Sequence, residues 1–262
     1  MQARAVVASV LAMALVLSGC AQPDHTIAPA GAPQPVESPT SPTPAPPPHP
    51  TVTKPPKPPL RPLPAKLPAG LRRNTGVRPV ALTFDDGPSP AWTPKVLDQL
   101  RAAKVTATFC VVGQEVQRHP ELVRRIVREG HQLCNHSWRH DLDLARRPVA
   151  EIQADLARTN KAIRTAAPGA KVSFYRQPGG RWTPEVLGVA KGLGMRPLHW
   201  SVDPQDWDKP NAATIGKRIH TAARPGAIVL LHDGGGNRAA TLAACPHLIA
   251  DLKQRFGITQ LR

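Results

Sequence analysis

Seven short apolar runs, separated by stretches with helical patterns, constrain the fold of this 262-residue chain more than any other feature. They have the length of strands and cover residues 80–84, 107–112, 132–135, 172–175, 197–202, 227–231 and 258–261. Alternation of strands with helices is typical of parallel sheets and barrels. We therefore expect an α/β fold whose chemistry lies at the carboxyl ends of the strands.

Helix boundaries can be predicted between several of these runs. Thr93-Pro94 and Thr183-Pro184 each predict an N-cap threonine followed by proline at the first helical position. Leu122 and Ile126 repeat at helical spacing. Gly130 follows them and predicts the end of that helix.

The first residues have the pattern of an export signal. Arg4 precedes an apolar stretch over residues 5–17, which is shorter than the roughly 20 residues that span a bilayer. The stretch ends in Leu17-Ser18-Gly19-Cys20, which is similar to a bacterial lipobox. We expect a signal peptide over residues 1–19 and a lipid on Cys20, with a plain secretory signal as the alternative. Either reading leaves no membrane-spanning helix and an extracytoplasmic protein, lipid-anchored to the outer face of a bacterial membrane or secreted.

Residues 20–75 have the composition of a tether. Residues 21–70 contain 18 of the 32 prolines and almost no large apolar side chain, so this segment cannot bury enough surface to fold. A polyproline II path of about 3.1 Å per residue would let it reach on the order of 150 Å. Residues 76–262 then form a single domain.

The domain from residue 76 is basic, with 27 Lys and Arg against 16 Asp and Glu. A net charge of +11 suits an anionic environment such as phosphate-bearing wall polymers or lipid headgroups. Nucleic acid is the other common partner of basic chains. The scattered arginines, the scarce aromatic residues and the export signal argue against it. We expect a monomer.

Two adjacent carboxylates, Asp85 and Asp86, end the first apolar run and lead into Gly87-Pro88. Neighbouring residues on a strand face opposite sides, so these carboxylates have different roles unless the strand has already ended. About fifty residues later, His136 and His140 lie four apart, on one face of an expected helical turn. One carboxylate and two such histidines form the ligand set of a catalytic zinc, whose fourth position is open for water.

Three more motifs follow: Arg176-Gln177-Pro178-Gly179-Gly180, Asp203-Pro204-Gln205-Asp206-Trp207 and Leu230-Leu231-His232-Asp233. The five motifs in this order resemble those of the polysaccharide deacetylase family, the NodB-homology domains of carbohydrate esterase family 4. The resemblance covers roughly residues 77 to 262. It implies a distorted, incomplete TIM-like (β/α) barrel and a metal-dependent N-deacetylase of an acetamido-sugar polymer.

The resemblance also implies a role for each site residue. One divalent metal, zinc or alternatively cobalt, is bound by Asp86, His136 and His140. Asp85 is the general base, and Arg176 pairs with it. His232 is the general acid, and a carboxylate beside it is needed to keep it charged. We expect that carboxylate to be Asp203, with Asp206 as the competing choice.

The substrate pocket departs from the family pattern at one point. The oxyanion donor is implied to be the backbone N–H of Gly179, at a position that is usually aromatic, and Gln177 stands where proline is common. A backbone N–H donor survives the substitution by glycine, so we expect the oxyanion role to persist. The missing aromatic ring should leave a wider, less hydrophobic pocket wall rather than abolish activity. Trp207 and Leu230 are expected to line an apolar pocket for the acetyl methyl group.

The remaining cysteines and histidines have structural interpretations. Cys110 and Cys134 fall on successive expected strands, where a disulfide and two buried thiols are equally acceptable. Cys245 lies in a helical pattern and is expected to be a packed thiol. Three further histidines are expected to be structural or exposed: His131, His199 and His220.

Three functions remain open from the sequence. The leading one is N-deacetylation of peptidoglycan or of chitin-type oligosaccharides. An ester deacetylase acting on acetylxylan is the nearest alternative, and a catalytically silent glycan-binding domain is the alternative from another class. The sequence does not distinguish GlcNAc from MurNAc and does not identify the metal.

Overall fold

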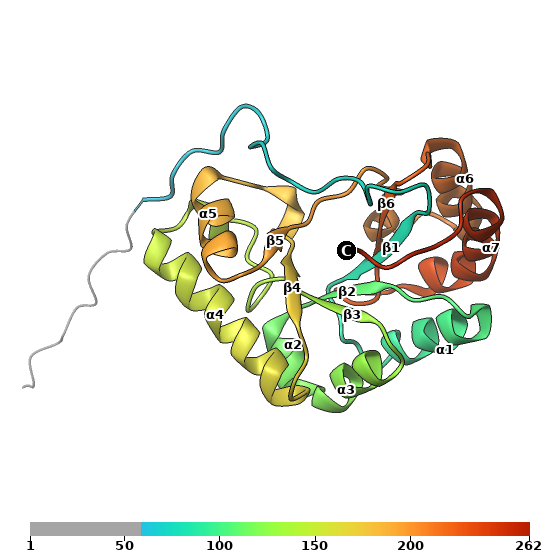
Figure 1. Cartoon of the computed structure of the whole chain (residues 1–262), viewed down its shortest axis with the longest axis horizontal. Coiled ribbons are helices and arrows are strands. Elements are labelled where there is room, and N and C mark those ends of the chain that lie inside the picture. The colour runs from blue at the N-terminus through green and yellow to red at the C-terminus, as the bar shows by residue number, and fades with distance from the viewer. Residues whose placement is uncertain (1–58) are drawn as a thin grey trace, which may run out of the picture. The chain divides into compact units, whose positions relative to one another are not determined.

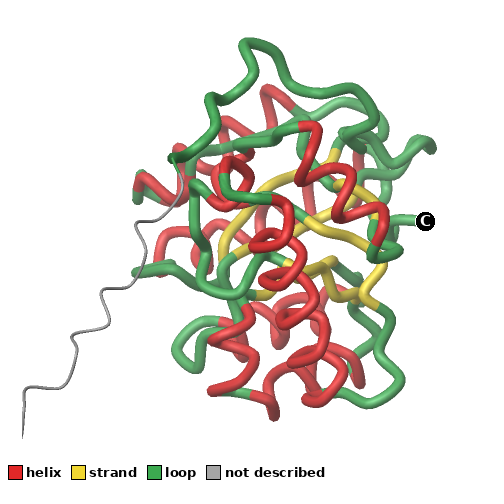
Figure 2. The backbone as a smooth tube through the Cα atoms, turned by 90° about the vertical axis from the view of Figure 1, so that its left-hand side faces the viewer, coloured by secondary structure: helices red, strands yellow, loops and turns green. Residues whose placement is uncertain are grey.

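The computed structural model describes residues 59–262, so the expected signal peptide, Cys20 and most of the tether lie outside the described residues. Six parallel strands form one curled sheet in the order β5-β4-β3-β2-β1-β6. Figures 1 and 2 show the strands inside, with helices around them. The strands are β1 Ala81–Asp85, β2 Thr108–Val111, β3 Gln132–Asn135, β4 Val172–Tyr175, β5 Arg196–Pro197 and β6 Ile228–His232. The expected α/β distorted, incomplete barrel is confirmed.

The helices cover the outside of the sheet. They are α1 Thr93–Ala103, α2 Gly113–Arg118, α3 Pro120–Arg128, α4 Val149–Ala166, α5 Pro184–Gly192, α6 Ala212–Ala222 and α7 Ala239–Arg255. None of the helices within residues 59–262 is long and apolar enough to cross a membrane.

Alternation along β1 shows how the strands divide the core. Leu82 and Phe84 belong to the large apolar cluster between sheet and helices. Ala81 belongs to a smaller cluster inside the barrel, together with residues from several strands: Cys110, Cys134, Phe174 and Ile228. Successive strand residues face opposite sides, so the inner set leads up to the polar residues at the strand ends.

Two of the seven expected strands form differently. Residues 258–261 make only an isolated bridge, between Ile258 and Val80. The N–H of Leu261 bonds to a side chain instead of a neighbouring strand and donates to Gln132 Oε1 at 3.0 Å. The run over 197–202 crosses between the two edges of the sheet. The run pairs with β4 only where it forms β5. Val202 then forms a bridge to Val229 of β6, which partly closes the barrel.

The predicted helix boundaries are mostly confirmed. α5 begins after Thr183, whose hydroxyl accepts from the N–H of Val186, and α3 ends two residues before Gly130, which has φ +83°. Thr93 is not an N-cap. It is the first residue of α1, and its hydroxyl instead donates to Asp233 Oδ2.

Residues 59–75 pack against the domain, although composition placed them in the tether. Arg61 Nη2 donates to the carbonyl oxygen of Arg147 at 2.6 Å, and Arg72 bridges to Leu198 beside β5. The folded region therefore starts before residue 76.

The cysteines pair inside the barrel. Cys110 of β2 and Cys134 of β3 are register partners and form a disulfide, which decides between the two alternatives left open. Cys245 is a buried free thiol in α7, as expected.

Candidate active site

The two adjacent carboxylates separate at the end of β1. Asp85 is the last residue of the strand, whereas Asp86 has a left-handed backbone with φ 72°. Asp85 Oδ1 accepts from Arg176 Nη1 at 2.6 Å, and Asp86 Oδ1 faces the two histidines. The strand ends between them, so each carboxylate has its own partners.

His136 and His140 lie in a loop after β3, so the expected helical turn is wrong. Ser137 and His140 have positive φ angles, 67° and 56°, which no helix contains. The loop is held by side chains instead. His140 N–H donates to Ser137 Oγ at 3.0 Å, and Trp138 N–H donates to Asp155 Oδ1 of α4 at 2.7 Å. The two imidazoles still converge, with ring centroids 5.0 Å apart.

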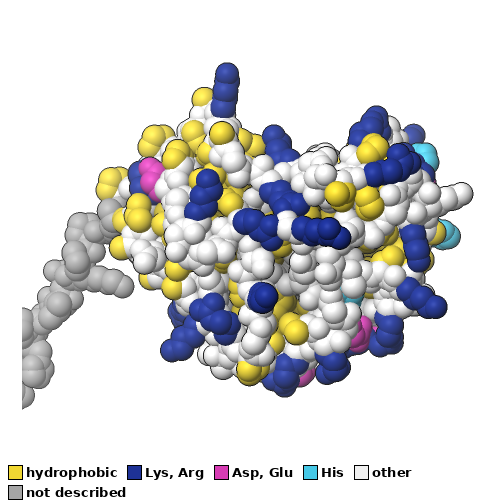
Figure 3. All heavy atoms as spheres, viewed as in Figure 1, with side chains coloured by type: hydrophobic (Ala, Val, Ile, Leu, Met, Phe, Trp, Pro, Cys, Tyr) yellow, Lys and Arg dark blue, Asp and Glu magenta, His cyan; other side chains and the backbone are white. Residues whose placement is uncertain are grey.

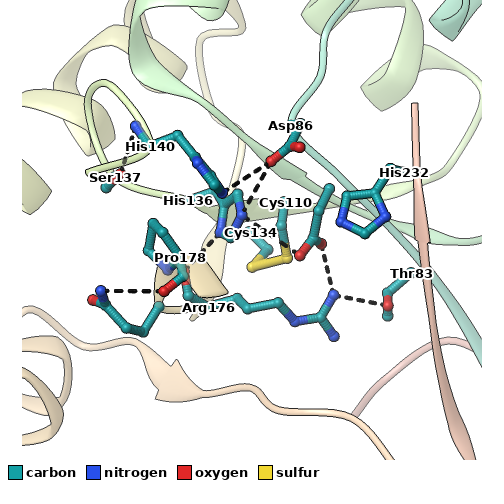
Figure 4. Close-up of polar contacts among 12 residues, drawn as sticks. Thr83, Asp86, Cys110, Cys134, His136, Ser137, His140, Arg176, Pro178 and His232 are labelled. Carbon is teal, nitrogen blue, oxygen red and sulfur yellow. Dashed lines mark hydrogen bonds and ion pairs between the residues drawn. A yellow bond between two sulfur atoms is a disulfide. The ribbon is translucent and has the colours of Figure 1, made fainter. Parts of the chain in front are cut away.

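Asp86, His136 and His140 point toward one another (Figure 4). Asp86 Oδ1 lies 3.4 Å from His136 Nε2 and 3.3 Å from His140 Nε2. It is buried and has no hydrogen-bond partner among the described residues. His136 Nδ1 lies 2.8 Å from the carbonyl oxygen of Arg176, so Nδ1 is the protonated nitrogen and Nε2 has a free lone pair. Two imidazoles and a carboxylate with an unpartnered oxygen fit a divalent cation.

Electrostatics keep Asp86 ionised. Its burial alone would raise the carboxyl pKa. The close approach of His136 Nε2 and the charges of His136, His232 and His140 outweigh burial and lower the pKa well below its ordinary value. The pKa of His136 is raised despite its burial, because Asp85 and Asp86 both face it.

Arg176 binds Asp85 from inside the barrel. Its side chain is completely buried, and Nη1 also donates to Thr83 Oγ1 at 2.8 Å (Figure 4). Nη2 donates to the carbonyl oxygen of His199 at 3.2 Å. The expected Asp85–Arg176 pair is therefore present, and Asp85 Oδ2 remains directed toward the metal ligands, 3.6 Å from His136 Nε2.

The carboxylate beside His232 is Asp206, so the choice of Asp203 is wrong. Asp206 Oδ1 lies 2.6 Å from His232 Nδ1, and Asp206 Oδ2 accepts from the backbone N–H of His232 at 2.9 Å. Asp203 is exposed, and its Oδ1 accepts from the N–H of Gln205, as in an Asx turn. The Asp203-Pro204 dipeptide already favoured a turn, a sequence signal against a buried partner.

Asp206 makes His232 a stronger base than an ordinary imidazole. Burial alone would lower the pKa of His232. The hydrogen bond and the charge of Asp206, with Asp86 and Asp85 further away, raise it. His232 therefore retains a proton to higher pH than a free imidazole.

One pocket of about 450 Å³ is lined by Asp85, the three candidate metal ligands and His232. Leu230 is buried in its wall, whereas Trp207 is 49% exposed at its edge. Gly179 is exposed with φ +61°, and the wall beside it is formed by Leu142 and Arg181 rather than by an aromatic ring. Trp200, which belongs to none of the five motifs, also lines the pocket.

A glycine loop and a buried arginine support Asp86 from behind. A Cβ on Gly234 would lie 2.2 Å from the carbonyl oxygen of Asp86, and one on Gly235 would meet Asp86 Oδ2. Arg238 is 4% exposed, donates to the carbonyl oxygen of Gly234 at 2.6 Å and lies 3.9 Å from Asp86 Oδ2. The run of glycines after His232 was the sequence signal for such a close approach.

The other histidines lie outside the pocket lining. His131 accepts from the N–H of Ala107, and burial lowers its pKa to about 4. Burial also lowers the pKa of His199 to about 4. His220 is exposed and pairs with Asp251 at 3.0 Å.

Residues 72–198 match the family model described as polysaccharide deacetylase. The chain is 44% identical over 200 residues to a chitooligosaccharide deacetylase of a Bradyrhizobium strain, covering 71% of this chain and 91% of the relative. It is 38% identical to a peptidoglycan-N-acetylglucosamine deacetylase of Bacillus cereus, covering 67% of this chain and 82% of the relative.

Solved structures have the same fold. A family 4 carbohydrate esterase from Streptomyces lividans, in complex with acetate, superposes with a TM-score of 0.63 at 32% identity, covering 70% of this chain and 91% of the esterase. A family 4 pseudoenzyme from Bacillus anthracis superposes with a TM-score of 0.66 at 28% identity, covering 72% of this chain and 65% of that longer chain. With its five motifs gathered around one pocket, this chain belongs to the polysaccharide deacetylase family.

Proposed function

We propose that the protein removes N-acetyl groups from an acetamido-sugar polymer, either peptidoglycan or a chitin-type oligosaccharide. The observation that carries this proposal is the convergence of three features on one pocket. These are the ligand set Asp86, His136 and His140, the Asp85–Arg176 pair, and the His232–Asp206 pair. The names of the relatives support both substrate classes.

The ligand set suits zinc, with cobalt as an alternative, because imidazole and carboxylate donors bind both. When bound there, such a cation supplies Lewis acidity and lowers the pKa of a bound water to about 7.

Asp85 and His232 perform the proton transfers. Asp85 Oδ2 accepts a proton as water oxygen bonds to the acetyl carbon, and Arg176 keeps this carboxylate oriented. His232 gives its Nε2 proton to the nitrogen as the C–N bond breaks, and Asp206 holds the other ring nitrogen. The products are acetate and a free amine.

The pocket lining places the acetyl group. Gly179 N–H is the candidate donor to the developing oxyanion, and Leu230 with Trp207 surrounds the methyl group. Leu142 and Arg181 replace an aromatic wall, which gives room for a bulkier or more polar sugar substituent.

Two alternatives are less well supported. An acetylxylan ester releases an alcohol, which needs a strong acid catalyst less than a leaving amine does, whereas His232 has the carboxylate partner and raised pKa of a proton donor. A catalytically silent glycan-binding domain would need neither a general base, nor a general acid, nor a full set of metal ligands. One structural relative is described as a pseudoenzyme, but this chain has all the residues named above.

We further propose that residues 1–19 are a lipoprotein signal peptide and that Cys20 carries the lipid. Residues from 20 to the start of the fold then tether a monomeric enzyme to the outer face of the cell membrane, near anionic wall polymers and without a nucleic-acid partner. The protein should partition with membranes, and Cys20→Ser should release it; unchanged partitioning would exclude the anchor.

The main experiment is acetate release by purified protein, run in parallel on peptidoglycan, chitin oligomers and acetylxylan. Rapid release from either acetamido polymer, abolished by chelation and restored by zinc, is expected. Release from acetylxylan alone would establish the ester alternative. No release from any substrate by metal-loaded protein would establish the silent domain.

A further inference from the structure

Two buried arginines lie beside the two adjacent carboxylates of the active site. The other Lys and Arg side chains of the described chain reach solvent, and Figure 3 shows many of them in dark blue on one face. Arg176 and Arg238 are 0% and 4% exposed. Arg176 pairs with Asp85 at 2.6 Å, whereas Arg238 lies beside Asp86. A buried guanidinium is retained only where partners compensate its charge, so the position of Arg238 requires an explanation.

The partners of Arg238 all belong to the active site or its supporting loop. Its Nε donates to the carbonyl oxygen of Gly234 at 2.6 Å, and its Nη2 donates to that of Gly235 at 3.3 Å. Its Nη1 donates to the carbonyl oxygen of Asp206 at 3.5 Å. Among the described residues, Asp86 is the only carboxylate that pairs with the guanidinium, with Oδ2 3.9 Å from Nη2. Arg238 therefore links the glycine loop after His232 to the candidate metal ligand.

The position of Arg238 in the chain does not otherwise favour a cation. It directly precedes α7 and occupies the N-cap position, where Ser, Thr, Asp and Asn are preferred. The dipole of α7 also disfavours positive charge at this end of the helix. A neighbour makes the capping contact, because Asn237 Oδ1 accepts from the N–H of Ala239 at 2.9 Å. The contacts with the active site, rather than the needs of α7, thus account for Arg238.

The two carboxylate oxygens of Asp86 face different groups. Oδ1 lies 3.4 Å from His136 Nε2 and 3.3 Å from His140 Nε2. Oδ2 faces Arg238 and Gly235, where an added Cβ would overlap this oxygen. The backbone of Asp86 is left-handed, with φ 72°, a conformation that a non-glycine residue keeps only when its surroundings hold it. The glycine loop and Arg238 supply those surroundings.

We propose that Arg238 is a positioning residue for the metal ligand Asp86, as Arg176 is for the base Asp85. Arg238 pairs with Oδ2 of Asp86 and fixes the glycine loop against this residue, so that Oδ1 alone joins the two histidine Nε2 atoms in binding a cation. The proposal rests on the ligand set of the proposed function, but not on the reaction. Groups that orient a metal ligand from outside typically change metal affinity by about 10- to 100-fold.

Zinc titration of apoproteins tests this role, because charge and positioning predict opposite signs. Arg238 lies near the cation site, so removal of its charge alone would relieve repulsion and strengthen zinc binding. Loss of positioning should weaken it, and we expect Arg238→Met to lose zinc affinity on the order of 10- to 100-fold. Arg238→Lys keeps the charge but lacks the planar guanidinium that binds three carbonyl oxygens, so it should also bind zinc more weakly than the wild type.

Arg125→Met is the matched control. The side chain of Arg125 is 19% exposed and pairs with Asp98 at 2.6 Å and with Glu129 at 2.7 Å, none of which lines the active-site pocket. Its removal should leave zinc affinity unchanged. Binding by Arg238→Met as tight as in this control, or tighter, would overturn the proposal. Wild-type affinity in Arg238→Lys would also overturn it, because charge without the guanidinium would then be sufficient.

A second pair of variants leaves Arg238 in place and tests the same contact. Gly235→Ala adds a Cβ that overlaps Asp86 Oδ2, so the carboxylate must turn away from Arg238. Gly236→Ala is its control, since Gly236 also has a positive φ, 142°, but a Cβ there meets nothing within 4 Å. Gly235→Ala should weaken zinc binding and change the visible absorption spectrum of cobalt-loaded protein, whereas Gly236→Ala should do neither. Identical affinities and spectra for the two variants would overturn the proposal.

Wild-type measurements separate this proposal from the proposed function. Zinc binding by the wild type without acetate release from any substrate would refute the function, while weaker zinc binding by the Arg238 variants would still support the positioning role. Acetate release by the wild type, together with unchanged zinc affinity in the Arg238 and Gly235 variants, would refute only the positioning role. Absence of zinc binding by the wild type would refute both.

Discussion

The two ion pairs beside the metal ligands differ in what holds the functional group. Asp85 is paired with Arg176, a permanent cation that is completely buried below it. His232 is paired with Asp206, and the charge on this imidazole depends on pH. The orientation of the base, Asp85, is thus fixed by a permanent ion pair, which defines the base side of the site. On the acid side, the charge of His232 depends on pH. Variants on the two sides should therefore fail in different ways.

The largest effect is expected on the base side. Asp85→Asn should lower kcat by about 10²–10⁴-fold, the usual contribution of a general base. The loss should be similar at every pH on the plateau, because the amide cannot accept the proton at any pH. Initial rates of acetate release across the pH range measure this. A loss confined to one end of the range would show that Asp85 acts through another titrating group.

The next effect concerns stability. Arg176→Gln leaves Asp85 as a buried charge without its cation, so the free energy of unfolding should fall by about 3–5 kcal/mol. Arg181→Gln is the control, since the partner of Arg181, Asp143, lies at the surface 3.3 Å away and such pairs contribute at most about 1 kcal/mol. Urea unfolding of both variants measures the difference. Equal free energies of unfolding for the two variants would mean that the buried Asp85–Arg176 pair does not stabilise this part of the site.

A smaller and different effect is expected on the acid side. His232 loses its proton as pH rises through its raised pKa, so activity falls on the alkaline side. Asp206→Asn removes the charge that raises this pKa, and the alkaline limb of kcat/KM should move to lower pH. Asp203→Asn, which removes a carboxylate not bonded to His232, should leave the limb in place. The reverse result would restore Asp203 as the partner.

The smallest effect is expected at Thr241. Its hydroxyl donates to Asp206 Oδ2 at 2.8 Å, and Thr241→Val removes that bond with little change in shape. Stability should fall by about 1 kcal/mol in a denaturant titration. The alkaline limb should keep its position, because Asp206 remains charged. A limb displaced as far as in Asp206→Asn would show that Thr241, rather than charge, sets the pKa of His232.

The sequence predicted the parts of the site that depend on strand ends. β3 and β4 have the predicted bounds, and Asp85 and Asp86 lie where the first apolar run stops. Prediction from the sequence failed where side-chain hydrogen bonds determine the backbone conformation. The His136–His140 loop has positive φ angles supported by Ser137 and Asp155, and spacing of four residues alone suggested a helix.

Other errors arose because the deciding contacts join distant segments. Nothing near Asp206 in the sequence shows that it meets Thr241 and His232, which lie 35 and 26 residues away. Arg238 likewise reaches Asp86 only because the glycine loop after His232 packs against that residue. Propensity and spacing describe neighbours along the chain, whereas these contacts depend on how β1 and β6 pair.

The division of roles between Asp85 and Asp86 is the central claim, and metal affinity tests it most directly. Zinc titration of the apoproteins of Asp85→Asn and Asp86→Asn, each compared with the wild type, separates a base from a ligand. Asp85→Asn should bind zinc with nearly wild-type affinity, whereas Asp86→Asn should bind it far more weakly. Weak binding by Asp85→Asn together with normal binding by Asp86→Asn would contradict the assignment and exchange the two roles.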